Sequence, residues 1–147
     1  MNLSPHFTLI EGTKSQTASR LGIDNTPSPD EIVQMKALCV NVLEPIRAHF
    51  GPVRVNSFYR SPRLNAEVGS KSSSQHTKGQ AADIEVSGVP TRELAEWIKA
   101  NVLVDQIILE HVSPSDPFSG WVHVSFADVC RAQCLTINSA GTFQGFA

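Results

Sequence analysis

The segment that most restricts how this chain can fold is the strand-like run AADIEV at residues 81–86, because it carries an aspartate among apolar residues. Burying an unpaired carboxylate costs on the order of several kcal/mol, so Asp83 needs either a compensating partner or an exposed face. His76 lies seven positions earlier, and Gly79 between them allows a tight turn that could bring the two side chains together. The pair suggests a metal site, which requires a third ligand.

The third ligand is found in a second strand-like run, WVHVSF at residues 121–126. Alternate residues of a strand share a face, and His123 here alternates with valines that belong in a core. If the apolar faces of both runs enter the same core, His123 and Asp83 emerge on the same outer face. Together with His76 they form a set of two histidines and one aspartate.

Such a set leaves a fourth coordination position for water, which is the pattern of catalytic rather than structural zinc. Zinc in this setting polarises a carbonyl group and lowers the pKa of water to about 7, so the expected reaction is hydrolysis of an amide.

Charge and hydropathy exclude several classes of function. The 147 residues suffice for one domain with its own core. Twelve basic and 14 acidic residues give a net charge of -2, so we expect neither nucleic acid nor a membrane as a partner. The chain has no long apolar run, and its first residues, MNLSPHFTLIEG, do not resemble a signal peptide. We expect a monomer that is cytoplasmic as synthesised.

The three cysteines, Cys39, Cys130 and Cys134, form no Cys-x-x-Cys motif, and their odd number argues against a disulfide framework. We interpret them as packing residues. Cys130 and Cys134 could share a helical face as zinc ligands, but no other candidate ligand adjoins them in the sequence.

Local signals predict a mixture of helices and strands. We expect helices at 16–21 between Ser15 and Gly22, at 30–50 with a kink at Pro45, after residue 62, and at about 91–100 with Thr91 as N-cap. We expect strands at 53–59, 81–86, 106–110 and 121–126, and an edge hairpin in the tail.

This mixture favours an α+β fold, a small antiparallel sheet flanked by helices. We expect a single domain spanning 1–147, with a helical part at about 1–50, the sheet and metal site at about 53–126, and a C-terminal tail at 127–147.

The run SQHTKGQAAD, residues 74–83, resembles the Ser-x-His-x-x-Gly-x-Ala-x-Asp signature of the zinc D-alanyl-D-alanine carboxypeptidase family, which includes phage endolysins and vancomycin-resistance dipeptidases. The run WVH, residues 121–123, resembles its later motif with the third ligand, and SFYRSP, residues 57–62, resembles its upstream Ser-x-x-Arg segment. The similarity covers about residues 53–126, and the FTL and TASRLGIDNTP segments also resemble phage and prophage members.

The resemblance implies one Zn²⁺ per chain, held by His76, Asp83 and His123, in a fold shared with lysostaphin-type enzymes and the hedgehog signalling domain. It implies that Arg60 holds a substrate carboxylate or carbonyl, which a guanidinium can bind bidentately. The alternative is that Arg60, like Arg63, is a solvated loop charge.

Two further residues are expected beside the substrate. Ser74 would orient the substrate or a loop amide, although it also fits a flexible polar loop, and Trp121 would line the substrate site.

One position departs from the family pattern. Many relatives have a glutamate, the general base, three residues before the last zinc histidine, where this chain has Gly120. Glu110 is the expected replacement, because it lies on the outer face of the 106–110 strand if Ile107 and Leu109 face the core. The alternatives are an ordinary strand-end glutamate at 110 and a general base at Asp116 in the next loop.

The other histidines are not expected in the site. His111 would point away from Glu110 in a regular strand, and His6 and His49 lie outside every motif.

The resemblance implies a zinc metallopeptidase that hydrolyses stem peptides of bacterial peptidoglycan, as a D-Ala-D-Ala carboxypeptidase or an endolysin-type endopeptidase. It would reach the cell wall by holin-type release or as part of a phage particle. The alternative is a non-catalytic, zinc-stabilised binding or structural module of a phage or prophage, which Gly120 favours.

Overall fold

The structure, a computed structural model, describes residues 1–147. The helices are α1 (Leu9–Thr13), α2 (Gln16–Leu21), α3 (Pro29–Leu38), the π-helix η1 (Cys39–Leu43), α4 (Glu44–Phe50), α5 (Pro62–Glu67), the 3-10 helix η2 (Gln75–Lys78) and α6 (Thr91–Asn101). The strands are β1 (Asn2–Ser4), β2 (Phe7–Thr8), β3 (Arg54–Ser57), β4 (Ala81–Glu85), β5 (Gln106–Glu110), β6 (Trp121–Ser125), β7 (Gln133–Asn138) and β8 (Gly141–Gln144).

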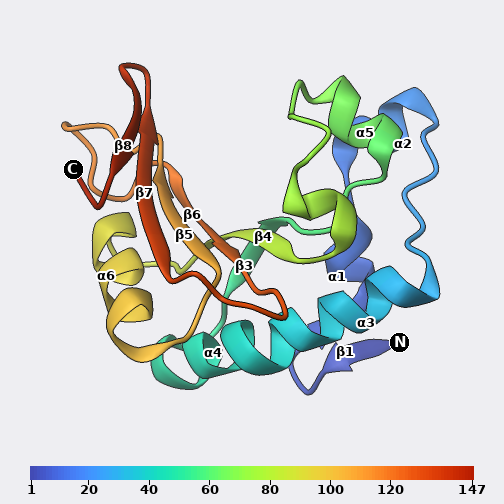
Figure 1. Cartoon of the computed structure of the whole chain (residues 1–147), viewed down its shortest axis with the longest axis horizontal. Helices are drawn as coiled ribbons and strands as arrows, with labels where there is room; N and C mark the ends of the chain where they lie inside the picture. Colours follow the sequence, from blue (N-terminus) through green and yellow to red (C-terminus); the bar gives the residue numbers. More distant parts are fainter.

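The main sheet has six strands in the order β3-β4-β6-β5-β7-β8, and β1 and β2 form a separate two-stranded sheet (Figure 1). The prediction of an α+β fold is confirmed, but the prediction of an antiparallel sheet is wrong for one pair, because β5 and β7 run parallel. Strand β6 is already flanked by β4 and β5, so the chain that leaves it pairs with the free edge of β5. The expected edge hairpin of the tail is confirmed as β7 and β8.

One face of the sheet carries the core. Helices α3, η1, α4 and α6 supply buried side chains to the same apolar cluster as the sheet. The sheet residues in that cluster include Ala82, Ile84, Ile107, Leu109, Val122 and Val124. The predicted alternation of β4, β5 and β6 is therefore confirmed, and the polar residues between these positions lie on the opposite face.

The predicted helix over 30–50 forms as three consecutive segments, α3, η1 and α4. The N–H of Glu44 donates to the carbonyl of Cys39, five residues earlier, in the wide turn of a π-helix. Pro45 follows at once and has no N–H to donate, so it does not continue the regular ladder. The expected irregularity at Pro45 thus takes the form of a π-helical turn.

The two predicted helix caps have different outcomes. Ser15 Oγ accepts from the N–H of Ala18 at 3.1 Å and Gly22 adopts the left-handed conformation, so the boundaries of α2 are confirmed. Thr91 is not the N-cap of α6, because it is already helical and its Oγ1 donates to the carbonyl of Ser119 at 2.7 Å. This tertiary contact replaces the local one.

Gly79 is required where it stands. It ends η2 with a φ of +71°, and a Cβ there would lie 2.6 Å from the carbonyl oxygen of Glu31 and 2.8 Å from Met35 Cγ. The turn between His76 and Asp83 is therefore pressed directly against α3.

Replacing Gly79 with alanine should destabilise the protein more than the same change at Gly88. Both glycines have a positive φ, which costs alanine about 1 kcal/mol, but a Cβ at Gly88 meets nothing within 4 Å. The clash at Gly79 should add roughly 1 to 3 kcal/mol. Urea unfolding of both variants measures the difference, and equal losses would contradict the close packing of this turn.

Candidate metal centre

Three elements bring the predicted ligands together. His76 lies on η2, Asp83 on β4 and His123 on β6, and the last two residues are direct cross-strand partners. One ligand atom from each residue lies within 4.8 Å of the others. The expected cluster of His76, Asp83 and His123 therefore forms.

Hydrogen bonding leaves one nitrogen of His76 free for a ligand. Its Nδ1 lies 2.6 Å from the carbonyl oxygen of Phe58, which can only accept, so Nδ1 carries the proton. The lone pair is then on Nε2, which is buried, has no hydrogen-bond partner and lies 3.4 Å from Asp83 Oδ1. A carbonyl that fixes the tautomer from behind is typical of metal-binding histidines.

The electrostatics keep His76 and Asp83 in the protonation states of metal ligands. Burial lowers the pKa of His76 and outweighs the opposing effect of Asp83, so the imidazole is neutral. Burial alone would raise the pKa of Asp83, but the hydrogen bond with His123, at 3.1 Å, and the proximity of His76 outweigh it and lower the pKa. Two imidazoles and one ionised carboxylate are a donor set that fits zinc.

Ser74 and Gln75 position the turn that carries His76. Ser74 Oγ accepts from the N–H of His76 at 3.3 Å, so the serine orients a loop amide. Gln75 Nε2 donates to Asp105 Oδ2 at 2.8 Å, and Asp105 Oδ1 accepts from Arg131 Nε at 2.8 Å. Asp105 and Arg131 belong to no motif, and sequence reasoning missed this support.

Glu110 lies beside the cluster. It is opposite Trp121 in the sheet, and its Oε2 accepts from Trp121 Nε1 at 3.1 Å and lies 4.0 Å from His123 Nδ1. Burial raises the pKa of Glu110, and the charge of Asp83 adds to this effect. The structure therefore places a carboxylate within one water of the cluster.

The backbone explains why this carboxylate is not at position 120. Gly120 has a φ of +71°, and a Cβ there would overlap the carbonyl oxygen of Glu110. A glutamate side chain cannot occupy that position in this backbone.

Asp116 is not brought to the cluster. Its carboxylate accepts from the N–H of Phe118 at 3.0 Å, within its own loop. The carbonyl of Pro117 in that loop accepts from the N–H of Thr91 at 3.0 Å, at the start of α6. Since α6 covers the core face, the loop is held away from the face that carries His123.

His111 is exposed and lies outside the metal cluster, as expected, but its side chain does not follow the alternation of a regular strand. This residue has a φ of +55°, which ends the alternation of β5, and its ring packs 5.3 Å from that of Trp121. No local signal in the sequence indicates a positive φ at a histidine.

The other histidines lie outside the cluster, as expected. His6 Nδ1 is 2.6 Å from Glu44 Oε1, and the ring of His49 stacks on that of Trp97 at 4.4 Å. The three cysteines are free, and Cys39 is buried. None of them belongs to the group that could hold a metal.

No helix combines the length and the apolar character needed to cross a membrane.

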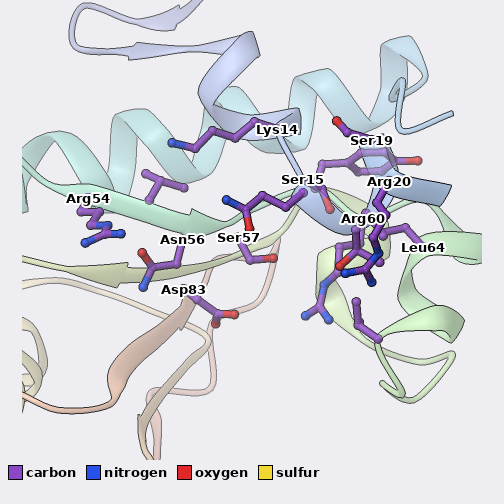
Figure 2. A pocket seen from close by; sticks show the side chains of 15 residues that line it. Lys14, Ser15, Ser19, Arg20, Arg54, Asn56, Ser57, Arg60, Leu64 and Asp83 are labelled. Carbon is purple, nitrogen blue, oxygen red and sulfur yellow. The ribbon is translucent and has the colours of Figure 1, made fainter. Parts of the chain in front are cut away.

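Arg60 lies next to the turn that carries His76. The backbone N–H of Arg60 donates to the backbone carbonyl of His76 at 3.1 Å. In the guanidinium group, Nε is buried and has no hydrogen-bond partner. Burial lowers the pKa of Arg60, while the charges of Asp83 and Glu110 oppose this shift. Arg60 and Asp83 both line a cleft of about 1080 Å³ (Figure 2). The cleft therefore reaches the cluster at Asp83 and is large enough for a ligand.

A His, Asp, His cluster with a nearby carboxylate and an adjoining cleft is typical of single-zinc hydrolases. A family model described as Peptidase M15 matches residues 5–125, and the chain belongs to this family. The resemblance to zinc D-Ala-D-Ala carboxypeptidases is thereby confirmed at the level of the family. A search of curated protein sequences found no match.

Replacing His123 with alanine should abolish stoichiometric zinc binding while the domain remains folded, because the core does not depend on this side chain. Metal analysis after dialysis, with circular dichroism as the check on folding, measures both effects. His6→Ala is the matched control and should keep one zinc per chain. Full zinc retention by His123→Ala would show that His123 is not a zinc ligand.

Proposed function

We propose that the protein is a zinc metallopeptidase that hydrolyses peptide bonds of bacterial peptidoglycan, with one zinc ion held by His76, Asp83 and His123. The observation that carries this proposal is the buried Nε2 of His76, whose lone pair faces a carboxylate oxygen of Asp83 at 3.4 Å. A buried nitrogen and a partly buried carboxylate oxygen, both acceptors, call for a cation between them. Membership of the Peptidase M15 family supports a peptidase.

When bound, zinc would polarise the scissile carbonyl and lower the pKa of an attacking water. Glu110 is the general base in this proposal: it accepts a proton from that water and passes it to the leaving amine. The indole N–H of Trp121 orients the carboxylate of Glu110. Arg60 holds a carboxylate or carbonyl of the substrate from the side of the cleft.

The decisive experiment is digestion of purified peptidoglycan, with the released fragments identified by mass spectrometry. Release of free alanine from stem peptides indicates a carboxypeptidase, whereas longer peptide fragments indicate an endopeptidase. A chelator should abolish the release and added zinc should restore it. A protein that holds one zinc and releases no fragment would be the non-catalytic module instead, and the proposal would fail.

Replacing Glu110 with glutamine should lower kcat by roughly 10² to 10⁴ with zinc still bound, because it removes the proton acceptor and keeps the shape. The base must be ionised, so wild-type kcat/KM should fall as the pH falls through the pKa of Glu110, and the variant should lose this acid limb. The measurement is a pH profile of kcat and kcat/KM on a verified substrate.

Asp116→Asn is the matched control and should retain near-normal kcat. If Asp116→Asn loses activity while Glu110→Gln keeps it, the base lies in the loop and the assignment of Glu110 is wrong. If both variants keep normal kcat, neither carboxylate is the base.

Replacing Arg60 with lysine should lower kcat/KM by about tenfold without loss of zinc, because an ammonium group cannot reproduce the bidentate geometry of a guanidinium. Arg63→Lys, at an exposed neighbouring position, is the control. Steady-state kinetics and metal analysis on the same preparations test this. Unchanged kinetics for Arg60→Lys would indicate that Arg60 does not bind the substrate and is only a solvated loop charge.

A further inference from the structure

The direction of the Arg60 side chain is not set by contacts of its own. Arg60 forms no ion pair within the protein, and its Nε is buried without a hydrogen-bond partner. Lys14 and Arg20, the cations that line the same cleft from the ends of α1 and α2, are exposed, whereas Arg60 is partly buried (Figure 2). A long and flexible side chain reaches one point in a cleft only if the backbone that carries it is fixed.

Asn25 holds that backbone on both sides. Its Nδ2 donates to the backbone carbonyl of Tyr59 at 3.1 Å, and its Oδ1 accepts from the backbone N–H of Ser61 at 2.7 Å. These two groups belong to the two peptide units that flank the Cα of Arg60. Because a peptide unit is planar, fixing both units fixes the direction in which the Arg60 side chain leaves the backbone.

The side-chain amide of Asn25 also reaches α1. Its Nδ2 donates a second hydrogen bond, at 2.8 Å, to the backbone carbonyl of Thr13, the last residue of that helix. All three partners are backbone groups with fixed roles, two carbonyls that accept and one N–H that donates, so the orientation of the amide is determined. A side chain at this position must supply two donors and one acceptor, which asparagine does and aspartate or alanine does not.

The loop that carries Asn25 is itself fixed by packing. Ile23 is buried in a cluster with Ala18 of α2 and Leu64 of α5. Helices α2 and α5 lie beside each other in Figure 1, and α5 begins shortly after Arg60. Asn25 therefore holds the backbone around Arg60 from a loop that has its own place in the fold.

We propose that Asn25 is a positioning residue for Arg60: by holding both flanking peptide units, it aims the guanidinium at the place in the cleft where Arg60 binds the substrate. This inference rests on the proposed peptidase function and adds a residue to the same site. Asn25 does not line the cleft, so it acts on the substrate only through Arg60. Its loss should therefore change catalysis only while the guanidinium is present.

The first test is a double-mutant cycle on the zinc-loaded protein, with the synthetic peptide L-Ala-γ-D-Glu-L-Lys-D-Ala-D-Ala as substrate. Asn25→Ala should lower kcat/KM about tenfold, because a small misplacement of a group that holds the substrate is costly. In the Arg60→Ala background the same change should lower kcat/KM less than about twofold, since the group that Asn25 aims is gone. Metal analysis should show one zinc per chain in every variant. If the wild type cleaves purified peptidoglycan but not the peptide, the rate of fragment release takes the place of kcat/KM.

The second test does not depend on catalysis. Isotope-labelled arginine gives an NMR signal for the buried Nε–H of Arg60, which is assigned by its absence in Arg60→Lys. In Asn25→Ala this N–H should exchange with solvent about tenfold faster, because the segment around Arg60 opens locally. The backbone amides of β6 should keep their exchange rates, which separates local opening from a general loss of stability.

Thr91→Val is the matched control. It also removes a hydrogen bond to a backbone carbonyl, that of Ser119, but it lies outside the cleft. Whatever its effect on the free energy of unfolding, it should leave kcat/KM near normal and the exchange of the Arg60 Nε–H unchanged.

Equal losses of kcat/KM in the two backgrounds, no loss in either, or an unchanged exchange rate at Arg60 in Asn25→Ala would overturn the inference and leave the peptidase proposal in place. If the wild type cleaves neither the peptide nor purified peptidoglycan, the peptidase proposal fails and the exchange measurement alone decides. Faster exchange confined to Arg60 would then support the positioning role of Asn25, and unchanged exchange would overturn it.

Discussion

The contact on which the site depends is the pairing of Asp83 with His123 across β4 and β6. A shift of this register by one residue would turn every side chain of one strand to the other face of the sheet. The neighbouring apolar residues of the two strands prevent such a shift, because Ile84 and Val122 are fully buried beneath the helices. The burial that stabilises the fold therefore also sets the position of two of the three candidate ligands.

The position of the third candidate ligand, His76, depends on different contacts. His76 lies on a short 3-10 turn rather than a strand, so sheet pairing does not place it. Its ring is fixed by the carbonyl of Phe58, and its backbone by Ser74 and Gly79. A few local contacts thus fix the position of His76, whereas strand pairing fixes the positions of Asp83 and His123. Metal-binding histidines generally donate a hydrogen bond from the ring nitrogen that does not bind the metal, and this bond orients the ring.

Sequence patterns predicted the features that rest on local periodicity. The alternation around Asp83, His123 and Glu110 indicated which face each would occupy, because a strand has a fixed period of two residues. The patterns failed where distant contacts decide, as at Thr91, which bonds to Ser119 instead of capping its helix, and at His111, where a positive φ ends the strand. The parallel pairing of β5 with β7 and the cations that line the cleft from α1 and α2 arise only on folding, and no short motif encodes them.

Gln75 is hydrogen-bonded to Asp105, and Asp105 is hydrogen-bonded to Arg131. The match to the family model ends at residue 125, so Arg131 lies outside the matched region. The guanidinium of Arg131 holds the pKa of Asp105 at about 2, so the carboxylate stays ionised and keeps hold of Gln75. Gln75, the neighbour of the candidate ligand His76, is thus anchored by residues outside the region that the family model matches. Two members of the family with the same signature can therefore differ in how firmly they hold that histidine, and hence in metal affinity.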